Sequence, residues 1–230
     1  MNDDGWWLIP DSAKRIERML LEAWVRVTPR LARLFCVACC RVVDRKDYDY
    51  NSRLRQALIA AEQFADGIIS LEELAEARRG AYDAYRETAW PSPGGAGDGV
   101  QQYLAVTMAA DPEIRCEISR NCISINCLAV LLHWKCCLSE DDGRNLSLVV
   151  RDLFGDNLSR PATIDPNLLT ADVLGIARYM YVDRDFTVAP ILADALQKAG
   201  CEDEPILQHC RRPGPHFRGC WVVDLVLGRE

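Results

Sequence analysis

The feature that most constrains the fold is the helical spacing of apolar residues along almost the whole chain. In the segment PRLARLFCVACCRVV (29–43), apolar residues recur at intervals of three and four, and later segments repeat this spacing. Few segments alternate apolar and polar residues in the way a half-buried strand does. The pattern therefore predicts an all-α protein.

Helix start and stop signals divide this pattern into about ten helices. Gly67 is a stop signal, and Ser70 with Glu73 forms a capping box, so a short turn should join two antiparallel helices there. A later start signal at Asp111 predicts a long helix that extends to about Leu138. We expect a single domain of about ten packed helices, mostly arranged as antiparallel pairs.

The C-terminal third carries the clearest boundaries. Thr170 is a helix start, and Asp203 followed by Pro205 is another. Gly200 and Gly228 are stop signals. The segment predicts a series of short helices, interrupted by the rigid turn RPGP (212–215).

One stretch breaks the helical pattern by composition. Residues 91–99 read PSPGGAGDG, which is typical of a flexible loop or linker. We interpret it as a surface loop of the single domain. The alternative is a subdivision of the chain into segments 10–90 and 100–230.

Composition excludes several classes of protein. The 230 residues are 49% hydrophobic and 27% charged, as in a globular protein rather than a disordered one. The first ten residues, MNDDGWWLIP, lack the features of a signal peptide, and no apolar stretch is long enough to span a bilayer. We therefore expect a cytoplasmic protein that does not associate with membranes.

Charge gives little reason to expect nucleic-acid binding. The net charge is −7, although residues 26–55 carry eight basic residues against three acidic ones, a net charge of +5. No aromatic residues alternate with these basic residues as they would in a base-stacking surface. Nucleic acid is an unlikely partner, and a basic helix face balanced by acidic helices explains the same residues.

The cysteines raise the question of a metal site. The chain has eleven, and an odd number without an export signal favours reduced, buried thiols over a disulfide framework. Zinc prefers four cysteine or histidine ligands. Our candidate ligands, on the CVACC helix and around the RPGP turn, are Cys36, Cys40, Cys210, His216 and Cys220. His209 belongs to the same cluster around the turn.

Two other chemistries fit the sequence less well. The segment ending at Glu73 resembles the second half of an EF-hand loop, but Phe64 occupies a calcium-ligand position. His209 and Cys210 could form a cysteine–histidine pair, but neighbouring residues of a helix point about 100° apart. The sequence contains no nucleophile elbow or phosphate-binding loop, so we predict no catalytic residue.

Two segments carry a family resemblance. RLFCVACCR and ILADALQKAGCEDEPILQHCRRPGPHFRGCWVVDLVLG resemble signature segments of a large paralogous group of uncharacterised planctomycete proteins. The resemblance implies a helical, cytoplasmic protein and brings no activity or catalytic residues. It also implies that CVACC and the pattern HC-x5-H-x3-C are features of the group.

Our leading functional hypothesis is a non-catalytic helical module that binds a protein partner or acts as a scaffold. Trp6 and Trp7, on an N-terminal arm, are its candidate contact residues. The alternative is a protein that uses cysteine and histidine to hold structural zinc or to sense a metal. An enzyme with a cysteine nucleophile is a weaker alternative, and we expect no cofactor other than zinc.

Overall fold

The computed structural model describes residues 28–42, 52–89, 109–111, 117–119, 122–124, 140–155 and 164–229. These residues contain eight α-helices, against about ten expected, and the all-α prediction is confirmed. The chain divides into two compact units, Met1–Leu146 and Ser147–Glu230. The division falls within a helix, whereas segment 91–99 lies outside the described residues.

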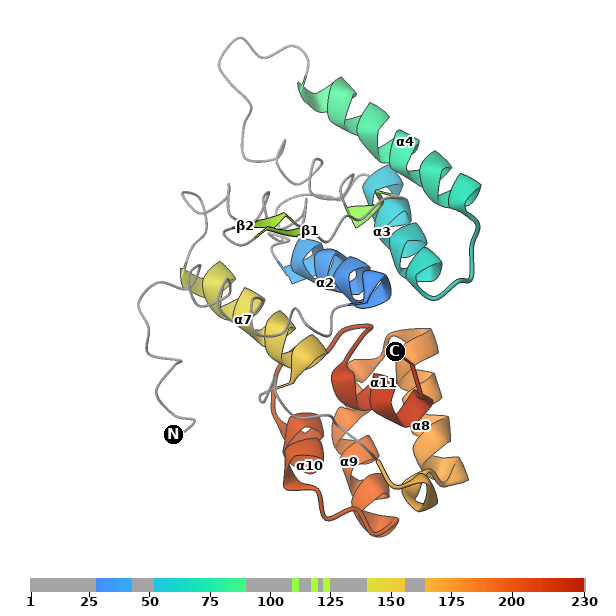
Figure 1. The fold of residues 1–230 in the computed structure, drawn as a ribbon, viewed down its shortest axis with the longest axis vertical. Helices are drawn as coiled ribbons and strands as arrows, with labels where there is room; N and C mark the ends of the chain where they lie inside the picture. The colour runs from blue at the N-terminus through green and yellow to red at the C-terminus, as the bar shows by residue number, and fades with distance from the viewer. Residues whose placement is uncertain are drawn as a thin grey trace. The chain divides into compact units, whose positions relative to one another are not determined.

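The first unit contains α2 (Pro29–Val42), α3 (Ser52–Ala65) and α4 (Leu71–Ala89). The predicted capping box is present: Glu73 N–H donates to Ser70 Oγ, and Ser70 N–H donates to the Glu73 carboxylate. Gly67 precedes it with a φ of 68°, the left-handed conformation that favours glycine. The short turn folds α4 back along α3, which confirms this helix pair (Figure 1).

Helix α2 is buried over most of its length. Thr28 caps its start by accepting a hydrogen bond from Leu31 N–H. The nine consecutive residues from Ala32 to Cys40 are buried, including Cys36, Cys39 and Cys40. Among them Arg33 donates to the carbonyls of Ala109 and Asp111. A helix buried on all sides is a core element, and its cysteines act there as small apolar residues.

The prediction of one continuous helix from Asp111 to about Leu138 is wrong, because part of this segment is extended. Strands β1 (Glu117–Ser119) and β2 (Cys122–Ser124) form an antiparallel pair there, with Ile118 opposite Ile123. Two residues separate the strands in the sequence, the commonest spacing in a β-hairpin. β-Branched isoleucine fits a strand better than a helix, so cross-strand pairing prevails over the weak helical spacing.

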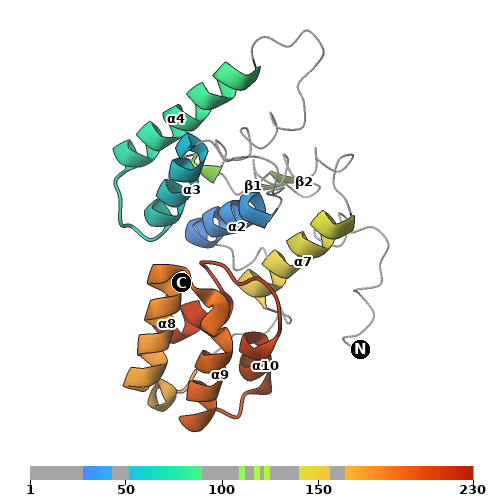
Figure 2. The ribbon, with the colours of Figure 1, turned by 180° about the vertical axis from the view of Figure 1, so that it is seen from behind.

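The second unit begins within α7 (Glu140–Phe154) and continues through 3₁₀ segments η4 (Pro166–Leu168) and η5 (Phe186–Val188). Its remaining helices are α8 (Ala171–Asp183), α9 (Ala189–Lys198), α10 (Glu204–Arg211) and α11 (Trp221–Leu227). Figures 1 and 2 show α8–α10 gathered into one bundle. In the described part of the chain, no helix has the length and apolar character needed to cross a bilayer.

The predicted boundaries of these helices are confirmed. Thr170 accepts from Val173 N–H at the start of α8, and Asp203 accepts from Ile206 N–H at the start of α10. Gly200 and Gly228 follow α9 and α11 with positive φ values of 101° and 62°. Such short helices are stabilised mainly by packing, here around a common buried core. Its largest fully buried side chains are Tyr181, Met180, Leu192 and Leu196.

Candidate metal centre

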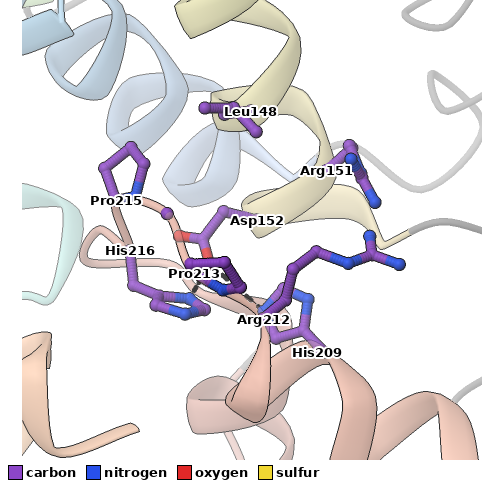
Figure 3. A pocket seen from close by; sticks show the side chains of 9 residues that line it. Leu148, Arg151, Asp152, His209, Arg212, Pro213, Pro215 and His216 are labelled. Atoms are coloured by element: carbon purple, nitrogen blue, oxygen red, sulfur yellow. Dashed lines mark hydrogen bonds and ion pairs between the residues drawn. The ribbon is translucent and has the colours of Figure 1, made fainter. Parts of the chain in front are cut away.

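Four potential ligands from three parts of the second unit meet at one point. Asp152 lies in the last turn of α7 and His209 in the last turn of α10. His216 follows the turn after α10, and Cys220 is the N-cap residue of α11. One ligand atom from each lies within 4.8 Å of the others. Figure 3 shows Asp152 directed towards the two histidines.

Three of the distances between these atoms are close to the edges of a tetrahedral metal centre. His209 Nε2 lies 3.2 Å from both Asp152 Oδ1 and Cys220 Sγ, and Cys220 Sγ lies 3.8 Å from His216 Nδ1. A zinc tetrahedron with bonds of about 2.0–2.3 Å has edges of about 3.3–3.8 Å. Asp152 Oδ1 and His216 Nδ1 are closer, at 2.6 Å, and must separate for both to bind one ion.

Asp152 is a buried carboxylate with three hydrogen-bond donors. It accepts from His209 and His216 through Oδ1 and from Phe217 N–H through Oδ2, the last at 2.7 Å. Burial by itself would raise the pKa of Asp152, but the hydrogen bonds and charges of the two histidines outweigh burial and lower it. The ionised carboxylate is therefore stabilised inside the fold.

Trp221 determines which nitrogen of His209 carries hydrogen. Its indole Nε1–H donates to His209 Nδ1 at 2.9 Å, and an indole nitrogen can only donate. Nδ1 is then an acceptor, so the hydrogen of the neutral ring lies on Nε2 and points at Asp152 and Cys220. To bind a metal through Nε2, His209 must move this hydrogen to Nδ1 and give up the bond from Trp221.

Cys220 is a protonated thiol in this arrangement. Its side chain belongs to a residue only 1% exposed. Burial raises the pKa of this thiol well above its usual range, and the negative charge of Asp152 raises it further. The backbone N–H groups of Val222 and Val223 act in the opposite direction. A bound cation would favour the thiolate, because metal ligation displaces the thiol proton.

The four ligand atoms surround one point and are not arranged in a line for proton transfer. In a catalytic triad, one histidine nitrogen faces the carboxylate and the other faces the nucleophile. Here His209 faces both Asp152 and Cys220 through Nε2, and His216 faces both through Nδ1. A buried thiol with a raised pKa is also a poor nucleophile. The arrangement therefore suits metal binding better than cysteine catalysis.

The structure brings together only part of the predicted ligand set. His216 and Cys220 are both in the four-residue group. Cys210 is buried on α10 outside it, with its pKa raised to about 12 by burial and by the charge of Asp152. Cys36 and Cys40 are buried on α2 in the first unit and do not belong to the group.

Two members of the group are absent from the predicted ligand set. His209 belongs to the cluster around the RPGP turn from which two ligands were expected, but the predicted set names Cys210, His216 and Cys220 there. Asp152 lies between apolar residues of α7, and Val149, Val150 and Leu153 around it are buried. An acidic residue inside an apolar helical stripe is a signal for a paired or metal-bound carboxylate. That signal was present in LVVRDLF, although it does not name the partners.

Other predicted features form ion pairs in the first unit or lie outside the described residues. In the basic segment, Arg30 pairs with Asp66, Arg41 with Glu62, and Arg53 with Glu87. These pairs fit the interpretation of a basic face balanced by acidic helices. They also engage the carboxylates of Glu62 and Asp66, which stand two residues before and after Phe64 at the other calcium-ligand positions of the EF-hand-like segment. Trp6 and Trp7 lie outside the described residues, so the interaction hypothesis stays a prediction.

Comparisons with protein-family models, curated proteins and solved structures found no match to this chain. The resemblance to the planctomycete group therefore stays a prediction.

Proposed function

We propose that the second unit binds one zinc ion through Asp152, His209, His216 and Cys220, and that this metal has a structural role. The observation that carries the proposal is the convergence of four ligand atoms, within 4.8 Å of one another, from segments far apart in the sequence. Asp152 and His209 are 57 residues apart. One ion at this point would link α7, α10 and the start of α11.

The charge of the centre favours a divalent cation. Asp152 carries one negative charge, and Cys220 would carry another as a thiolate, while both histidines bind in their neutral form. A divalent cation would make the buried group neutral, which limits the cost of enclosing charge in the protein.

The ligand types favour zinc among the divalent cations. Magnesium and calcium prefer oxygen ligands, whereas zinc accepts sulfur, nitrogen and oxygen together. Four protein ligands also leave no coordination position free, which is typical of structural zinc. Loss of such an ion should loosen the packing of α7 against the C-terminal helices.

Metal analysis of the purified full chain tests the proposal. The protein, reloaded with zinc and freed of excess metal, should retain one zinc per chain with a Kd below about 1 µM. The Cys220→Ser variant should bind zinc at least about 100-fold more weakly, because it lacks the thiolate ligand.

Cys201→Ser is a matched control for this variant. Cys201 is a buried cysteine of the same unit that does not belong to the group. The control should retain zinc at the wild-type level even if it lowers stability. Less than about half a zinc per wild-type chain, or equal loss of zinc from both variants, would reject the proposal.

A further inference from the structure

One face of helix α8 is exposed and largely apolar. Tyr179 is 47% exposed and Val182 is 68% exposed, the highest value for a large hydrophobic residue in the described part of the chain. Ala171 and Gly175 are exposed on the same face, because residues three or four positions apart are neighbours on a helix surface. Figures 1 and 2 show α9 between α8 and α10, so α8 lies at one edge of the bundle. The face is therefore open to a partner.

Gly175 lies in the middle of this face, and no contact among the described residues requires glycine there. Its backbone is helical without a positive φ, and a Cβ added to it would meet no neighbouring atom within 4 Å. Glycine destabilises the interior of a helix relative to alanine, because it loses more conformational freedom on folding. The close approach of a second backbone would account for glycine at this position, since only glycine has no side chain to prevent it.

Two opposite charges flank Gly175 symmetrically. Asp172 lies three residues before it and Arg178 three residues after it, and both are exposed. Neither side chain forms an ion pair with another residue in the described part of the chain. When two copies of α8 pack antiparallel and cross at Gly175, residues equally far before and after Gly175 lie opposite each other. Asp172 of each copy then faces Arg178 of the other, whereas a parallel arrangement would bring like charges together.

The same antiparallel register also matches the apolar residues. Tyr179 of one copy lies opposite Ala171 of the other, a small residue that leaves room for the tyrosine ring. The Tyr179 hydroxyl donates to Asp185 Oδ2 at 3.1 Å, which restricts the position of this ring. Val182, one turn further along α8, extends the apolar contact beyond Ala171 of the other copy. The face is therefore complementary to itself in both size and charge, as a twofold-symmetric interface requires.

We propose that two copies of this chain form a twofold-symmetric dimer through α8, with the two helices antiparallel and crossing at Gly175. The proposal is independent of the zinc site, because no residue of this face belongs to the four-residue group. One pair of helices makes a small interface, and small interfaces are typical of weak complexes. We therefore expect a dimer with a Kd of about 1–100 µM.

Sedimentation velocity of the full chain over a range of concentrations tests this inference, with a reductant present to prevent disulfides between copies. Gly175→Ala should weaken the dimer at least about tenfold, because two methyl groups would meet where the helices cross. The same substitution should leave the monomer at least as stable as the wild type in urea denaturation, because alanine favours the helix and its Cβ has open space. Loss of the dimer would then not be a consequence of misfolding.

Gly80→Ala is the matched control for this variant. Gly80 is also a glycine within a helix, α4, and a Cβ there would make only an ordinary contact of 3.9 Å with Arg53. This control should dimerise as the wild type does.

A charge exchange tests the antiparallel register. Arg178→Asp should weaken the dimer at least about tenfold, because it places like charges opposite Asp172 at two symmetry-related positions. Adding Asp172→Arg to this variant exchanges the two charges and should restore dimerisation to within about threefold of the wild type.

Three results would overturn the inference. A chain that stays monomeric at about 500 µM does not form the dimer, and the face would then be left to a different partner. A dimer of unchanged affinity in Gly175→Ala and Arg178→Asp would use another surface. Failure of the charge exchange to restore a dimer that Arg178→Asp has weakened would contradict the pairing of Asp172 with Arg178.

Discussion

Asp152 is the residue on which the candidate centre depends most. It is almost fully enclosed, its side chain being 3% exposed, and it accepts hydrogen bonds from His209, His216 and Phe217 N–H. The same contacts hold α7 against α10 and the following turn when no metal is present. Asp152 therefore contributes to stability in the metal-free state and to ligation in the metal-bound state.

Replacing this carboxylate should destabilise the metal-free protein. Asp152→Asn places an amide N–H₂ among hydrogen-bond donors, and we expect a loss of about 2–4 kcal/mol in the free energy of unfolding. Urea denaturation in the presence of a chelator measures the change. Asp194→Asn is the control, because its exposed pair with Arg211 should contribute less than about 1 kcal/mol. Equal effects of the two substitutions would contradict the buried role of Asp152.

The destabilisation by Asp152→Asn should depend on pH. The folded-state pKa of Asp152 is lowered, so its ionised form stabilises the protein above the unfolded-state pKa of about 3.9. That contribution is lost as the pH falls through the lowered folded-state pKa. The stability difference between metal-free wild type and variant should therefore be largest at neutral pH and shrink below about pH 4. A difference that is the same at pH 7 and pH 3 would contradict this linkage.

The hydrogen bond from Trp221 to His209 opposes metal binding. Trp221→Phe keeps an aromatic ring but removes the N–H that holds His209 Nδ1 as an acceptor. We expect this variant to bind zinc as tightly as the wild type or up to about tenfold more tightly, while the metal-free protein loses stability. Competition with a chelating indicator measures the affinity, with His209→Ala as the comparison. A loss of affinity as large as that of His209→Ala would show that the indole supports the ligand instead.

At the scale of elements, the local sequence predicts the helix boundaries of this chain but not its strands. The Ser70–Glu73 capping box and the Gly200 and Gly228 stops were predictable, because each depends on residues a few positions apart. The β1–β2 pair was missed because a strand of three residues gains its stability from the opposite strand. Short apolar segments do not separate these alternatives by spacing alone.

Helix α2 provides a test of the prediction that cysteines serve as core residues. Cys39 is fully buried. Burial raises the pKa of its thiol well above the usual range, and the neighbouring Cys40 raises this pKa further. A thiol-directed alkylating reagent at pH 7.5 should label Cys39 only when the protein unfolds, as mapped by mass spectrometry. Rapid labelling of Cys39 in the native protein would contradict its position in the core.

At the scale of the whole molecule, the candidate centre belongs to the second unit alone. All four of its residues fall within Ser147–Glu230. His216 and Cys220 were predictable as members of the group from their positions around the RPGP turn. The sequence did not indicate Asp152, because 64 residues separate this residue from His216 and only tertiary packing brings them together. The prediction of Cys36 and Cys40 as ligands rests on their helical spacing, which carries no information about contacts between distant segments.

X-ray absorption spectroscopy of the zinc-loaded full chain tests the central claim most directly, because it counts the ligand atoms around the metal. The proposed centre predicts one sulfur at about 2.3 Å and three nitrogen or oxygen ligands at about 2.0–2.2 Å. The Cys220→Ser variant should lose the sulfur contribution. Two or more sulfur ligands would contradict the Asp152, His209, His216 and Cys220 set and favour a centre with additional cysteines such as Cys210. A coordination shell without sulfur would show that the metal binds at a site that does not include Cys220.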